Sequence, residues 1–275
     1  MNKQFKILCG AVVLAVAGQV SAATSWTLTG AVPTPGVGVS GYANTGGTDD
    51  AAHAANAANN GALQTIQSAA WQGNVAGAYY GGIKNSDACT GVAGSGCALY
   101  GDWNENSTPE HAMDNNQRYD MALLSFGSSV KLTNMKLSYV NTDSDVTVMA
   151  YIGTGAPTMI GNTYNQLLGL GGWASIGNYA NIGTATTLIN AGGIYSSYWL
   201  IGAYNPLANG SASANGGALD VGNDYVKLAS VSGVACVGGT GPTCSPPGQV
   251  PEPGSLALFG LALLGMLTFR KRQKI

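Results

Sequence analysis

Two short apolar segments, one at each end, most constrain what the residues between them can fold into. At the N-terminus, Lys3 and Lys6 precede an apolar run from Ile7 to Ala17, and small residues follow up to Ala22. This order is typical of a secretory signal peptide. We therefore predict that a signal helix within residues 1–22 is removed and that the mature chain folds outside the cytoplasm.

The C-terminal segment has three parts, a Pro251-Glu252-Pro253 triplet, an apolar run from Leu256 to Phe269, and a basic end. The prolines make the triplet a stiff, extended spacer. As a helix, residues 255–269 would rise about 22 Å, less than the roughly 30 Å hydrocarbon core of a bilayer. Such a short transmembrane helix would be held on the cytoplasmic side by its basic residues, Arg270, Lys271, Arg272 and Lys274.

The order of triplet, short apolar span and basic end resembles the PEP-CTERM sorting signal of Gram-negative bacteria. The resemblance implies that exosortase, a membrane-embedded processing enzyme, recognises Pro251, Glu252 and Pro253. It also implies an inner-membrane intermediate and a final place at the cell surface or in an extracellular, exopolysaccharide-containing biofilm matrix. A permanent membrane anchor without processing is the alternative for the same tail.

Between the two ends we predict one mainly β, extracellular domain over residues 23–234, joined by a Gly/Pro-rich linker, residues 235–249, to a sorting and anchor segment, residues 250–275. Short alternating strands separated by Gly- and Asn-rich turns favour an antiparallel β-sandwich or jelly roll. The strands are expected within residues 25–39, 119–126, 130–140, 146–152, 172–179, 195–204 and 224–234.

Three local features add detail to this β-rich interpretation. Residues 130–140 and 146–152 are expected to pair as a hairpin across the turn at Asn141–Ser144. A one-residue slip in the alternation predicts a β-bulge near Thr133 and Asn134. The alanine-rich stretch 49–71 has Leu63, Ile66 and Ala70 at helical spacing, so it is expected to form one short helix or a small-residue loop.

The cysteines of the mature part form two pairs with equal spacing, Cys89 with Cys97 and Cys236 with Cys244. An even number of cysteines in an exported chain favours disulfides. Four cysteines allow three connectivities, of which local pairing is the simplest. Zinc is disfavoured because neither pair has CxxC spacing and no histidine lies near them.

Charge excludes one class of partner. Residues 23–250 contain five basic and twelve acidic residues, a net charge of −7, although the whole chain carries only −2. An acidic domain without a basic patch repels phosphate backbones, so we expect no nucleic-acid partner.

Acidic residues near the predicted strands provide a candidate calcium site. Hard cations bind several carboxylate, amide and carbonyl oxygens, and the candidate ligands are Asp114, Asp120, Asp143 and Asp145. The alternative is a surface turn whose Asp and Asn side chains bond their own backbone. For the alternative of a secreted hydrolase, Asp114 and Asp120 are the candidate acid–base pair. We expect no catalytic residue, because the chain lacks a GxSxG, an HExxH and a phosphate-binding loop.

Aromatic side chains suggest a further ligand class. Trp103 lies among Asp102, Asn104 and Glu105 and is the candidate for stacking on a sugar ring. Aromatic residues within strands more often fill a core. A carbohydrate- or calcium-binding adhesion module is therefore the alternative to a non-catalytic surface or matrix component, with exopolysaccharide as the candidate partner.

The middle of the chain carries a second resemblance. It is similar to the ectodomains of exosortase-dependent surface proteins, which implies fold and location only. The segments that carry the likeness are His111–Asn116, Asp120, Leu123–Phe126, Asp143–Asp145 and Gly222–Tyr225.

Overall fold

The computed structural model describes residues 22–29, 34–46, 65–72, 82–84, 109, 112–116, 118–170, 172–236 and 244. Several predicted features lie outside these residues. They are the signal peptide, the pair Cys89 and Cys97, Trp103, the Pro251–Pro253 triplet, and the apolar and basic tail.

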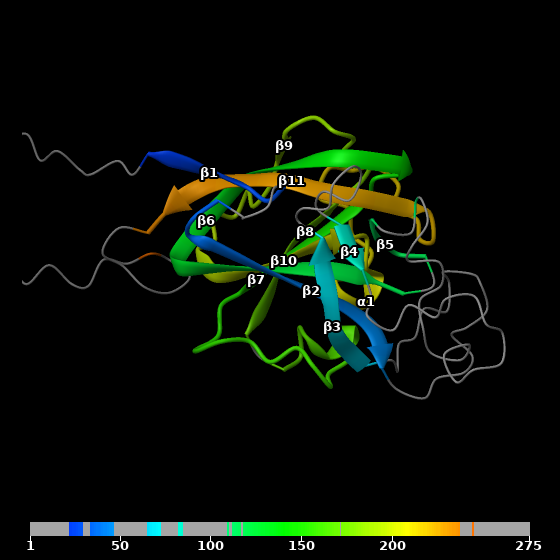
Figure 1. Cartoon of the computed structure of the whole chain (residues 1–275), viewed down its shortest axis with the longest axis horizontal. Helices are drawn as coiled ribbons and strands as arrows, with labels where there is room; N and C mark the ends of the chain where they lie inside the picture. Colours follow the sequence, from blue (N-terminus) through cyan, green and yellow to red (C-terminus); the bar gives the residue numbers. More distant parts are fainter. Residues whose placement is uncertain are drawn as a thin grey trace, which may run out of the picture.

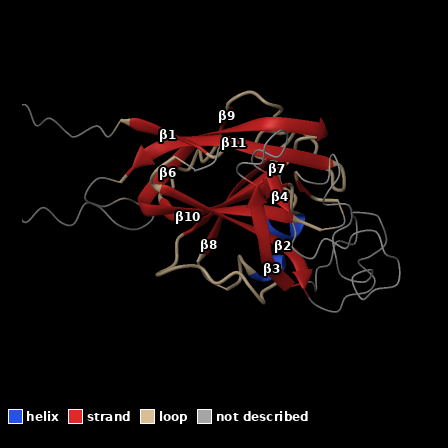
Figure 2. Cartoon of the chain, in the orientation of Figure 1, coloured by secondary structure: helices blue, strands red, loops and turns tan. Residues whose placement is uncertain are grey.

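The described part is mainly antiparallel β-structure with few helices, which confirms the predicted class (Figures 1 and 2). Two short helical turns are η4 (Tyr164–Gln166) and α1 (Pro206–Asn209). The strands are β1 (Ala23–Thr27), β2 (Val37–Gly46), β3 (Thr65–Gln72), β4 (Gly82–Lys84), β5 (Met113–Asp114), β6 (Asp120–Thr142), β7 (Val146–Tyr151), β8 (Trp173–Tyr179), β9 (Thr187–Leu188), β10 (Ser196–Ala203) and β11 (Asp224–Ala235).

The 23-residue strand β6 organises the sheet because its two halves have different neighbours. The first half pairs with β2 and β10, within the strand order β4-β3-β2-β6-β10-β7-β8. The second half pairs with β11, which also pairs with β1 and β5. Figure 1 shows these two groups of strands as two layers, with β6 running through both. The predicted sandwich or jelly-roll topology stays a prediction.

Both faces of the first half of β6 are buried, because successive side chains point to opposite faces of a strand. Ala122 and Leu124 belong to a hydrophobic cluster that also contains Val226 and Leu228 of β11. Side chains of the opposite face form a second cluster with the segment between β7 and β8 and with α1, and its members include Met121, Leu123, Tyr164, Leu167 and Ala208. This double burial explains why residues 119–126 read as a continuous apolar run.

The predicted hairpin between residues 130–140 and 146–152 is wrong. β7 pairs with β10 and β8, and β10 lies between β7 and the first half of β6. The chain reverses at residues 141–144, where Thr142 takes a left-handed backbone, φ 62°, but β7 then joins β10 instead of pairing with β6. The following Asp143 N–H then donates to the Asn223 carbonyl at 3.1 Å, which directs the chain toward the start of β11.

Two further local predictions have opposite outcomes. The predicted bulge is confirmed, because Ser232 lies opposite Asn134 while Gly233 lies opposite Leu132, which leaves Thr133 as the extra residue. The helix or loop predicted over residues 49–71 is wrong for its last part, since residues 65–72 form β3. Long-range pairing of β3 with β2 overrides the helical spacing there.

The first and last strands lie side by side. β1 pairs antiparallel with β11 over its whole length. Just beyond β11, Cys236 and Cys244 form a disulfide with Cα atoms 5.5 Å apart, which confirms local pairing for this cysteine pair. None of the helices in the described ranges is long and apolar enough to cross a membrane.

Candidate metal centre

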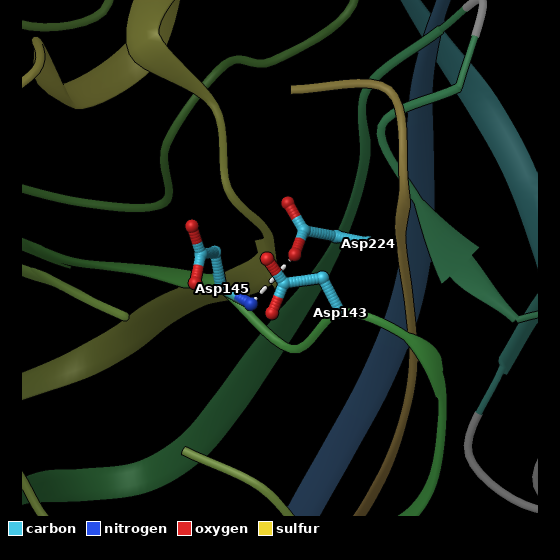
Figure 3. Close-up of side chains that lie close together, drawn as sticks. All are labelled: Asp143, Asp145 and Asp224. Atoms are coloured by element: carbon cyan, nitrogen blue, oxygen red, sulfur yellow. Dashed lines mark hydrogen bonds between the residues drawn. The ribbon is translucent and has the colours of Figure 1, made fainter. Parts of the chain in front are cut away.

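Three carboxylates meet where β6 ends, β7 begins and β11 begins (Figure 3). They belong to Asp143, Asp145 and Asp224, and one oxygen of each lies within 4.8 Å of the others. Asp145 and Asp224 are fully buried, and Asp143 is half-buried. The sequence predicted the first two as cation ligands and missed the third.

Backbone contacts at the end of β6 bring Asp143 to β11. Its N–H donates to the carbonyls of Asn141 at 2.8 Å and Asn223 at 3.1 Å. Its Oδ1 accepts from the Ser144 N–H at 2.6 Å. Asp143 and Asp224 also form an isolated β-bridge, so their side chains start from adjacent backbone positions.

Asp145 is held by donors from two loops. Its Oδ1 accepts from the Asn181 N–H at 2.8 Å, and its Oδ2 accepts from the Asp220 N–H at 3.1 Å. The Asp145 N–H in turn donates to Oδ1 of Asp224 at 2.6 Å, the contact drawn in Figure 3. These bonds orient Asp145 without any cationic side chain.

Asn115 positions Asp224. Its Nδ2 donates to Oδ2 of Asp224 at 2.5 Å and to the Tyr204 carbonyl at 3.1 Å. Its Oδ1 accepts from the N–H groups of Gly222 at 2.9 Å and Asp224 at 3.1 Å. One buried amide therefore ties β5, β10 and β11 together beside the carboxylates.

The electrostatics of the group are unfavourable for three ionised side chains. Burial raises the pKa of Asp224 from 3.8 to about 8, and the charges of Asp145 and Asp143 add to the rise against the opposing hydrogen bonds. Burial also raises the pKa of Asp145, with smaller contributions from Asp143 and Asp220. A proton or a cation bound among these oxygens would relieve the repulsion.

The donor set fits a hard cation. Ca²⁺ takes six to eight oxygen ligands, typically carboxylates, backbone carbonyls and water. Three carboxylates from two chain segments, residues 143–145 and Asp224, supply the acidic part of such a set. Because Asp143 is only half-buried, the group has a side from which an ion and its water can approach.

The other predicted ligands, Asp114 and Asp120, are not members of this group. Both are fully buried. Oδ1 of Asp114 accepts from the Asn116 N–H at 3.0 Å. This is the local side-chain-to-backbone bond that is expected if these residues form a turn instead of a calcium site. The charge of Asp120 adds to the burial that raises the pKa of Tyr164.

Sequence reasoning missed Asp224 as a ligand, and it placed Asn115 near the candidate calcium ligands without predicting its contact with Asp224. Both lie in segments that carry the second resemblance, Gly222–Tyr225 and His111–Asn116, so a signal was present. Their contact spans 109 positions of the chain. No local pattern of spacing reveals such a distant pairing.

The fold and the site together define a β-rich domain with one candidate site for a hard cation in its described part. The family model described as the PEP-CTERM protein-sorting motif matches residues 249–273. The chain therefore carries the suspected sorting motif, which implies export, membrane-associated sorting to the cell surface and processing by exosortase. Neither the curated proteins nor the solved structures contain a significant match to the chain.

Proposed function

We propose that this protein is a non-catalytic component of the cell surface or of an exopolysaccharide matrix, delivered as a substrate of exosortase. The match of the sorting motif at residues 249–273 carries the proposal. Pro251, Glu252 and Pro253 serve in recognition, the apolar run brings them to the enzyme, and the basic end fixes orientation. Full burial of Asp114 and Asp120 supports a non-catalytic role, because a general acid–base pair must reach its substrate.

Replacing Glu252 by Ala tests this function. We expect the variant to accumulate in the membrane fraction with Ile275 still at its C-terminus, whereas the natural protein ends near Pro251. Mass spectrometry of C-terminal peptides distinguishes the two forms. Glu110→Ala is the matched control, because Glu110 also follows a proline but lies outside the motif. Normal processing of Glu252→Ala would refute the proposal.

A second candidate function is calcium binding by the ectodomain. The meeting of Asp143, Asp145 and Asp224 favours it, since two of these residues are predicted ligands and all three offer oxygens to one position. Calcium would neutralise the buried charges and fasten the starts of β7 and β11 to the end of β6. The cation then stabilises the end of the domain where these strands meet.

Luminescence of bound terbium, displaced by calcium, measures this function directly. We expect natural protein to bind and Asp145→Asn to lose binding. Asp220→Asn is the control, because this exposed residue keeps its backbone N–H bond to Asp145 and its side-chain charge makes only a small contribution there. The calcium proposal fails if natural protein shows no calcium-displaceable luminescence, or if Asp145→Asn binds as well as Asp220→Asn.

A further inference from the structure

The chain enters and leaves the described domain at one end. Ala23, the first residue of β1, lies opposite Val234 near the end of β11, and Val234 lies opposite Lys131 of β6. The N–H of Cys236 donates to the Ser129 carbonyl at 2.7 Å. We call this end, which comprises Ala23, residues 127–131 and residues 234–236, the exit end (Figure 1).

Acidic residues lie at the opposite end, which we call the acid end. Asp224 opens β11, and eleven residues at about 3.3 Å each place it some 36 Å from Ala235. Asp120 is at the same end, because Gly202 of β10 lies opposite both Met121 and Thr147. The six acidic residues among those the structure describes are Asp114, Asp120, Asp143, Asp145, Asp220 and Asp224.

Two described basic residues, Arg118 and Lys227, also lie in the half of the domain near the acid end, but both side chains are buried. The basic side chains that reach the surface with described placement lie farther from Asp224. Lys131 lies opposite Val234 and is half-buried, with its Nζ 5.5 Å from the centre of the Tyr195 ring. Lys136 lies opposite Ser230, midway along β11, and is exposed. Anionic lipid headgroups attract basic side chains and repel carboxylates. The exit end is therefore the end whose described charges suit a membrane surface.

The Cys236–Cys244 disulfide shortens the connection from this end to the sorting motif. Without it, the fifteen residues from Cys236 to Pro251 span up to about 51 Å when extended. With it, the chain restarts at Cys244, 5.5 Å from Cys236, and only seven residues remain to Pro251, about 24 Å. The bond thus sets the farthest distance between the motif and the folded domain.

Resting on the proposed sorting function, we propose that the unprocessed protein stands end-on at the membrane. Its exit end faces an anionic lipid surface, and its acid end faces outward. The disulfide limits the gap between domain and bilayer. The candidate cation centre is thereby presented on the side away from the membrane.

Energy transfer to labelled lipid tests this orientation. Full-length protein is inserted by its tail into vesicles of phosphatidylethanolamine and phosphatidylglycerol that contain an acceptor dye. A donor dye is attached through an azide-bearing amino acid, so that the cysteines stay intact, at Ser128 or Thr184. Both positions are exposed. Ser128 belongs to the exit end, and Thr184 follows Gly183, whose N–H donates to Ser144 at the acid end at 3.0 Å.

We expect several-fold higher transfer efficiency from Ser128 than from Thr184. Equal or reversed efficiencies would overturn the orientation. The variant Cys236→Ser with Cys244→Ser should lower transfer from Ser128. Deleting residues 237–243 from that variant should restore it, since one peptide bond then replaces the disulfide. Unchanged transfer in the serine variant would overturn the role of the disulfide.

The outcome is separable from that of the sorting experiment, because the vesicles contain no exosortase. Glu252→Ala should leave the transfer efficiencies unchanged even though it blocks processing in cells. Background transfer from both positions would show that the tail does not hold the domain at the bilayer, and would overturn the end-on arrangement. Processing in cells would then still report on the sorting function.

Discussion

Asp224 is a fully buried carboxylate that accepts two hydrogen bonds yet has two carboxylates as neighbours. The donors favour its ionised form, whereas burial and the neighbouring charges favour its protonated form. The raised pKa, about 8, shows that burial and repulsion prevail when only the protein's own groups are present. At the residue scale, this side chain therefore links cation binding to pH.

The pH dependence of stability follows from that link. The pKa of Asp224 is 3.8 in the unfolded chain and about 8 in the folded protein, so the folded protein keeps this proton to a higher pH. Between these values the folded state binds more protons, so raising the pH should lower the melting temperature in EDTA. Calcium binds the ionised form, so it should raise the melting temperature more near pH 8 than near pH 5. An equal calcium shift at both pH values would contradict this coupling.

At the scale of elements, β10 has no space for a side chain at Gly202. A Cβ there would collide with the Asp120 carbonyl and lie 2.8 Å from the Met121 Cα. Gly202→Ala should destabilise the fold by about 1–3 kcal/mol, because β10 is paired on both sides and cannot shift. Gly127→Ala is the control, since a Cβ at Gly127 meets nothing within 4 Å. Denaturant unfolding of both variants measures the difference, and equal stabilities would argue against the tight approach of β6 to β10.

How far the sequence predicts this fold also depends on scale. Alternation and turn residues predict β8, β10 and β11 and the bulge at Thr133, because these features depend on neighbouring side chains. They do not predict that β10 separates β6 from β7, since register between distant strands depends on the whole core. The candidate cation site likewise has a part that depends on neighbouring residues and a part that depends on distant strands. Asp143 and Asp145 are close in sequence and were predicted, whereas Asp224 joins them only through the pairing of β6 with β11.

At the scale of the whole molecule, β11 is the element on which the described domain depends. It pairs with β1, β5 and β6 and contributes Val226, Leu228 and Val231 to the larger core cluster. A chain of residues 23–249 should therefore unfold cooperatively on heating, whereas residues 23–223 should show no cooperative transition. Circular dichroism distinguishes the two. A sharp transition in the shorter chain would mean that the other strands form a stable domain alone.

The pairing of β1 with β11 also has a consequence for the order of events during export. A chain that crosses the membrane from its N-terminus delivers β1 first and β11 last, immediately before the sorting segment. β1 cannot pair with β11 until nearly the entire domain has crossed. Its partner strand is far along the chain, since Ser25 and Ser232, which are in contact, are 207 positions apart. Completion of the fold and arrival of the sorting motif at the membrane thus coincide in time. Exosortase would therefore reach the sorting motif at about the time when β1 pairs with β11.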